Sequence, residues 1–135
     1  MKLELKHIAP YLPYGICWKF ESEDFTQDVI GLDITHEGVK LESPYYDFGS
    51  CSLNEGQPIL RPLSSMTKEE FSELKSKLDD GVLLKLTPNG DIYIKCNDEI
   101  YLYEVNILND FLFSNHFDVF DLIDNGLAID KNNLK

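Results

Sequence analysis

The chain has 135 residues, with 24 acidic and 12 basic side chains and a formal net charge of -12 at pH 7. Proteins that bind nucleic acids or anionic membranes do so through Lys and Arg, so this balance argues against both activities. It leaves open a solubilising charge, a basic protein partner and mimicry of the charge of DNA. Hydrophobic residues make up 43% and charged residues 27%, which predicts one folded domain over residues 1–135.

The cysteines and the apolar segments indicate a cytoplasmic protein. Cys17, Cys51 and Cys96 lie far apart and are odd in number, which does not fit a secreted disulfide framework. The N-terminus has no apolar run of signal-peptide length. No segment approaches the roughly 20 apolar residues that a membrane-spanning helix needs.

The first part of the chain predicts a meander of three strands. Pro10 and Pro13 limit the opening segment to a single helical turn. Strands are then expected over Ile16–Phe20, Asp28–Ile34 and Val39–Glu42, where apolar residues run together or alternate with polar ones. A turn that ends in Gly38 separates the last two, and glycine supplies the positive φ of a tight hairpin.

An irregular segment over Ser43–Leu63 is where we expect a binding surface, because long loops inside a domain are often functional. Glycines and prolines punctuate it, and a short edge strand is expected near Ile59 and Leu60. Aromatic residues are enriched at interfaces, and an arginine can anchor a carboxylate. The alternatives are that the aromatic residues fill the edge of the core and that the arginine pairs with an acid of this chain. The candidate binding residues are Tyr45, Tyr46, Phe48 and Arg61.

The clearest local signal is an amphipathic helix that begins after Thr67. Thr67 and Glu70 have the spacing of a capping box, and Met66 and Phe71 have the spacing of a hydrophobic staple. Its apolar residues, Phe71, Leu74 and Leu78, recur on one stripe. Gly81 is the expected stop. The narrow stripe predicts a surface helix that lies on a sheet.

A second meander is predicted next, over Val82–Thr87, Ile92–Cys96 and Ile100–Tyr103. The first turn is Pro88-Asn89-Gly90, in which proline presets φ and glycine takes the left-handed position. Large side chains alternate on both faces, with the isoleucines on one and Tyr93 on the other. Strands of this kind are covered on both sides or carry a contact surface.

The C-terminal part is predicted to be helical. Val105, Leu108, Phe111 and Leu112 follow a helical period. Asp118 is expected to cap a further short helix through Ile123. Gly126 would end that helix, with Leu127 contacting Leu122 as in a Schellman motif.

A search for chemistry identifies no catalytic residue and no cofactor site. The cysteines and histidines lack the spacing of metal ligands, so we expect no structural metal. Cys51 with His36 or His116 is formally a Cys/His pair, but almost any chain offers one. Asp47-Phe48-Gly49 spells a kinase motif without the rest of that fold, and we interpret it as coincidence.

Three segments, in the same order, resemble small proteins encoded in phages and mobile elements of gut bacteria. They are Met1–Gly15, Pro58–Ser64 and a C-terminal motif made of His116–Phe120, Leu122–Ile123 and Gly126–Asp130, and together they cover about a quarter of the chain. The resemblance implies a genomic setting, with no activity and no site residues.

These observations predict an α+β domain, with a small, mainly antiparallel sheet of two meanders, the Thr67 helix and C-terminal helices packed on it. The function hypothesis is a phage or mobile-element accessory protein that acts by protein–protein binding. A nucleic-acid-mimic decoy would need its acids on one exposed face, and a small enzyme would need a deep pocket with convergent polar groups. We expect a protein partner, which the net charge allows to be basic, and no membrane or direct nucleic-acid binding; a homo-oligomer stays open.

Overall fold

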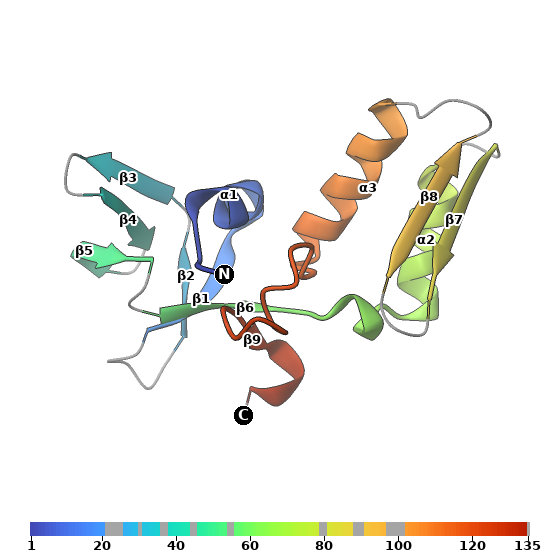
Figure 1. The fold of residues 1–135 in the computed structure, drawn as a ribbon. Helices are drawn as coiled ribbons and strands as arrows, with labels where there is room; N and C mark the ends of the chain where they lie inside the picture. The colour runs from blue at the N-terminus through green and yellow to red at the C-terminus, as the bar shows by residue number, and fades with distance from the viewer. Residues whose placement is uncertain are drawn as a thin grey trace. The chain divides into compact units, whose positions relative to one another are not determined.

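The computed structural model describes residues 1–20, 26–29, 31–35, 38–43, 46–53, 56–78, 81–87, 91–96 and 102–134. Helices and mainly antiparallel strands mix along the chain, which confirms the α+β class (Figure 1). The chain divides into two compact units: unit 1 is Met1–Arg61 with Phe120–Lys135, and unit 2 is Pro62–Val119. In the part of the chain that is described, no helix is long and apolar enough to cross a membrane.

Unit 1 begins with helical turns and continues as strands. Its elements are α1 (Leu5–Ile8), a 3-10 helix (Ala9–Tyr14), β1 (Ile16–Phe20), β2 (Thr26–Val29), β3 (Gly31–Thr35), β4 (Gly38–Ser43), β5 (Tyr46–Ser52), β6 (Gly56–Leu60), β9 (Ile129–Asp130) and a second 3-10 helix (Lys131–Asn133). The prediction that Pro10 and Pro13 limit this segment to a single helical turn is wrong, because helical structure continues from α1 to Tyr14 with Pro13 inside the 3-10 helix. A 3-10 helix tolerates Pro10 because proline stands at its start, where no N–H is needed.

The first predicted meander is divided between two sheets. β1 pairs with β2, whereas β3 pairs with β4, so the predicted strand Asp28–Ile34 is in fact the end of one strand and most of another. The continuous apolar run hid this break, although Gly31 at the start of β3 is a residue that permits a bend. The flanking strands pair as predicted, with Thr35 opposite Gly38 and Ile34 opposite Val39, whereas residues 36 and 37 of the predicted turn lie outside the described residues.

The segment that the sequence predicts to be irregular carries two strands, β5 and β6. β5 extends the sheet of β3 and β4. β6 is not an edge strand, since it lies between antiparallel β1 and parallel β9 (Figure 1). β9 pairs only with Ile59 and Leu60, so Pro58 falls outside the parallel ladder and its missing N–H is not needed there.

The end of the chain returns to unit 1 through turns rather than through the expected second C-terminal helix. The predicted Schellman motif is nevertheless present. Gly126 has φ of 73°, Leu127 donates its N–H to the Leu122 carbonyl at 2.8 Å, and Gly126 donates to Ile123 at 3.0 Å. Leu122 is fully buried, which anchors this segment in unit 1.

Unit 2 packs two helices against a β-hairpin. Its elements are a 3-10 turn (Leu63–Ser65), α2 (Lys68–Lys77), β7 (Val82–Leu86), β8 (Ile92–Cys96) and α3 (Leu102–Ser114). Buried side chains from both helices and from β7 form one cluster: Met66, Leu74, Leu78, Val82, Leu84, Leu108, Phe111, Leu112 and Phe117. The helical period predicted around Val105–Leu112 is therefore confirmed as α3.

The predicted start of α2 is confirmed atom by atom. Thr67 Oγ1 accepts a hydrogen bond from the Glu70 N–H at 3.1 Å, and Glu70 Oε1 accepts one from the Thr67 N–H at 3.0 Å. The predicted stop at Gly81 is wrong, since α2 ends at Lys77 and Leu78 is already extended. Leu78 leaves the helix but stays buried in the cluster, so tertiary packing ends the helix early.

β7 and β8 form the predicted hairpin, in which Leu86 pairs with Ile92. Residues 88–90 of the predicted turn lie outside the described residues. The third strand predicted over Ile100–Tyr103 is wrong from Leu102 onward, because α3 begins there. The alternating pattern misled the prediction, since a short run of isoleucine, leucine and tyrosine fits a strand and a helical start equally well.

Candidate binding surfaces

The residues predicted to form a binding site are not brought together in the described structure. Tyr45 lies outside the described residues. Tyr46 and Phe48 belong to β5 rather than to a loop, and their side chains are outside the description. Arg61 follows β6 directly, is partly exposed and has an interaction within the chain. The arginine is therefore not a free anchor.

An exposed surface that joins apolar and basic side chains lies on the outer face of the β7–β8 hairpin. Because side chains alternate along a strand, Leu83 and Lys85 of β7 face away from the cluster that buries Val82 and Leu84. Leu83 lies opposite Lys95, and Lys85 lies opposite Tyr93. Leu83 is 62% exposed and Tyr93 is 58% exposed. We call Leu83, Lys85, Tyr93 and Lys95 the hairpin face.

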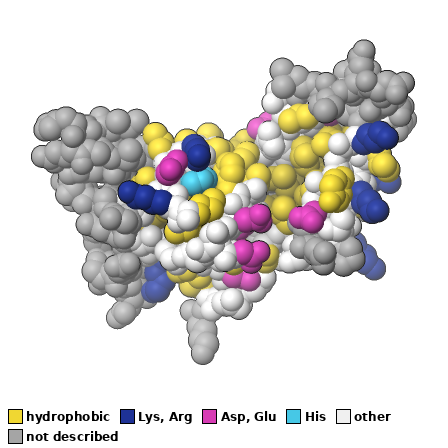
Figure 2. All heavy atoms as spheres, in the orientation of Figure 1, with side chains coloured by type: hydrophobic (Ala, Val, Ile, Leu, Met, Phe, Trp, Pro, Cys, Tyr) yellow, Lys and Arg dark blue, Asp and Glu magenta, His cyan; other side chains and the backbone are white. Residues whose placement is uncertain are grey.

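The charge of the hairpin face is opposite in sign to that of the whole chain. In the described part of the chain, neither Lys85 nor Lys95 takes part in an ion pair. Asp91, an exposed residue before β8, adds one acid at the turn end. Figure 2 shows lysine and hydrophobic side chains next to one another over this hairpin. An acidic partner would complement these two lysines, although the chain as a whole has a net charge of -12.

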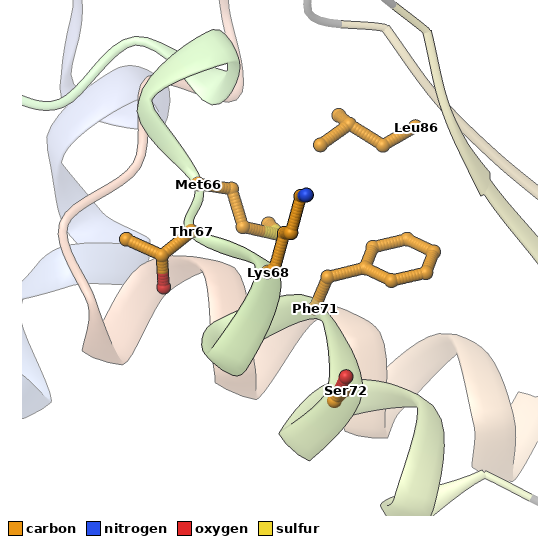
Figure 3. A pocket seen from close by; sticks show the side chains of 6 residues that line it. All are labelled: Met66, Thr67, Lys68, Phe71, Ser72 and Leu86. Carbon is orange, nitrogen blue, oxygen red and sulfur yellow. The ribbon is translucent and has the colours of Figure 1, made fainter.

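Unit 2 also has an open pocket of about 420 Å³ at the start of α2. Its walls are Met66, which is 8% exposed, and the partly buried Phe71 and Leu86. Thr67, Lys68 and Ser72 complete its lining, and the Lys68 side chain rises from α2 toward Leu86 (Figure 3). We call these six residues the α2 groove. It is an apolar hollow with a cation at its rim.

Two buried polar atoms in unit 2 have no hydrogen-bond partner in the described structure. They are Oε2 of Glu104, in the first turn of α3, and Nε2 of His116, just after that helix. The N-terminal end of a helix favours a carboxylate, which gives Glu104 a structural role. In the described part of the chain, no group of three or more His, Cys, Asp or Glu side chains is arranged to hold a metal ion.

Comparisons of the chain with protein-family models, with curated proteins and with solved structures found no match. The description of the chain therefore depends on its fold and its surfaces. It is an α+β protein whose second unit carries basic and apolar surface.

Sequence reasoning found one member of the hairpin face and missed the rest. The alternation over Ile92–Cys96 placed Tyr93 on a second large-residue face, and the structure exposes it. Leu83, Lys85 and Lys95 carried the same signal, since they alternate with apolar residues in two strands joined by a recognisable turn. The α2 groove had no such signal, because Leu86 joins it from another element.

Proposed function

We propose that the protein acts by binding another protein, and that the hairpin face is its docking surface. The observation that carries this proposal is the exposure of Leu83 and Tyr93 beside two lysines that have no ion pair in the described structure. Exposed aromatic and apolar groups supply contact area, and the flanking charges select the partner and speed encounter. The fitting partner has an acidic surface around an apolar patch.

The local charge decides between the candidate partners. Two lysines are too few to neutralise a nucleic-acid backbone against the repulsion of a chain of net charge -12. A symmetric dimer through this face would bring four lysines together, which costs free energy. The whole-chain charge favours a basic partner, but net charge is an average, and this face has the opposite sign.

The two other function classes receive less support. A decoy needs its acids together on one exposed face, whereas the described acids of the lysine-free stretch before Lys131 are mixed: Glu104 and Asp118 are buried, and Asp110, Asp121 and Asp124 are exposed. An enzyme needs convergent polar groups in a deep pocket, whereas the α2 groove is open and Thr67 already caps a helix. The resemblance of three segments to phage and mobile-element proteins supports an accessory role in such an element, and we place that role in the cytoplasm.

Site-specific photo-crosslinking tests the proposal. A benzophenone amino acid replaces Tyr93 in one protein and Tyr14, an aromatic residue of unit 1 that is 41% exposed, in the control. In bacterial lysate we expect a discrete protein adduct at position 93 that is absent at position 14. The double substitution Lys85→Glu and Lys95→Glu should remove it. Equal adducts at both positions, adducts to a second copy of the chain, or adducts to nucleic acid would each overturn the proposal.

A further inference from the structure

We propose that the α2 groove is a second recognition site, which takes one large apolar side chain from an acidic peptide segment. This inference depends on the proposed function in one respect, which is that the ligand is part of another protein. The groove is lined by Met66, Phe71 and Leu86, which also belong to or pack on the unit 2 cluster. A side chain seated there would therefore extend an existing core.

The shape of the groove favours a protruding side chain over a small molecule. Its volume of about 420 Å³ is near the lower end of the range for ligand pockets, roughly 300–1,000 Å³. Such pockets bury roughly 70–90% of their ligand, whereas this one is open to solvent along one side. An aromatic or leucine side chain anchored by its own backbone does not need to be enclosed, which is how anchors in peptide grooves bind.

The charges around the groove select an acidic segment. Positions three and four apart share a side of a helix, so Lys68, Ser72 and Lys75 line the groove side of α2 together with Phe71. Neither lysine forms an ion pair in the part of the chain that the structure describes. The acids of α2 lie on its outward face or its opposite flank: Glu69, Glu70 and Glu73.

On the opposite flank of α2, Lys77 provides a comparison, because its charge has partners within the chain. Lys77 Nζ lies 3.5 Å from Glu73 Oε1 and 5.6 Å from the centre of the Phe111 ring. Lys68 and Lys75 have no comparable partner among the described residues, although the chain has twice as many acids as bases. Among the described residues, two lysines without an ion pair thus lie beside an open apolar groove, and an acidic segment with one apolar anchor complements both.

The test uses the full chain and a defined probe, a twelve-residue peptide of Asp, Glu, Ser and Gly with one central Trp. The chain has only two methionines, so labelling their methyl groups with carbon-13 gives an NMR spectrum with an internal control. Met66 lines the groove, whereas Met1 is 68% exposed at the N-terminus. We expect the peptide to shift the Met66 methyl signal by the ring current of its Trp and to leave Met1 in place.

Matched changes separate the apolar from the charged part of the site. A peptide with Ser in place of Trp, or with Asn and Gln in place of its acids, should bind at least about tenfold more weakly. The double substitution Lys68→Glu and Lys75→Glu should weaken binding by a similar factor. The control Lys2→Glu with Lys131→Glu changes the net charge equally at exposed positions of unit 1 and should leave binding within about twofold.

Any one of several results would overturn this inference. They are the absence of any Met66 shift at millimolar peptide, equal binding of the neutral peptide, and equal loss of binding in the unit 1 control. A single-stranded oligonucleotide that shifts Met66 when the peptide does not would also overturn it. The hairpin variant Lys85→Glu with Lys95→Glu should still bind the peptide, so failure of this site and failure of the hairpin face are observed separately.

Discussion

Two residues with positive φ occupy the same position of a Schellman motif, one in each unit. Gly126 has φ of 73° in unit 1, and His116 has φ of 60° in unit 2. In unit 2, Phe117 donates its N–H to the Leu112 carbonyl at 2.9 Å, which repeats the Schellman bond seen after Gly126. Glycine adopts this conformation freely, whereas other residues lose about 1 kcal/mol or more. Histidine at this position therefore costs unit 2 stability that glycine does not cost unit 1.

Reciprocal substitutions measure that difference. We expect Gly126→Ala to lower the free energy of unfolding by about 1 kcal/mol. A Cβ at Gly126 would meet no atom within 4 Å, so the loss would come from the backbone alone. His116→Gly should raise the free energy of unfolding by a similar amount, because it relieves the backbone and removes a buried ring nitrogen that has no hydrogen-bond partner among the described residues. Urea denaturation gives both values, and a stabilising Gly126→Ala would contradict this account.

At the scale of elements, the start of α2 combines a cap with a core anchor. We expect Thr67→Ala to lower the free energy of unfolding by about 1 kcal/mol, because the Glu70 N–H loses its acceptor. Thr67→Ser keeps the hydroxyl and serves as the control, with little loss. Met66→Ala should cost more, about 2–5 kcal/mol, because Met66 is buried in the unit 2 cluster. An equal midpoint for Thr67→Ala and wild type in chemical denaturation would mean that the cap contributes nothing.

Elements with local signals could be predicted from the sequence, and those fixed by distant contacts could not. The cap of α2 and the Schellman motif at Gly126 are recognisable because their hydrogen-bond partners lie within a few residues. The central place of β6 depends on β9, about seventy positions away, which no periodicity reveals. The α2 groove could not be predicted for the same reason, because Leu86 and Phe71 come from different elements and lie close together only in the folded chain.

At the scale of the whole molecule, the local charge of two surfaces is opposite in sign to the net charge of the chain. The net charge of -12 predicts a basic partner, yet the lysines at the hairpin face and beside the α2 groove lack ion pairs in the described structure. Part of the excess acid is structural: Asp130 accepts a backbone hydrogen bond from Asn132 at 2.8 Å, and Glu70 caps α2. The net charge therefore says less about the partner than the positions of the charged side chains that have no ion pair in the described structure.

The C-terminal twenty residues contribute to both units, so we expect truncation after Asn115 to leave an unfolded or insoluble chain. The deletion removes Phe117 from the unit 2 cluster and removes Leu122 and β9 from unit 1. Phe117 is fully buried, so Phe117→Ala alone should cost about 3–5 kcal/mol. Phe120 is partly exposed against the His7 ring, so Phe120→Ala should cost less than Phe117→Ala.

Circular dichroism melts of the truncated and full-length proteins check this expectation. If residues 116–135 were instead an exposed docking helix, the truncated chain would keep a sharp thermal transition near that of the full chain and would lose only binding. The turns that replace the expected helix, with Leu122 buried and Ile129 paired to Ile59, argue for the architectural role. Burying one such apolar side chain contributes about 1.5–3 kcal/mol, so losing several exceeds what a domain stable by about 5–15 kcal/mol tolerates.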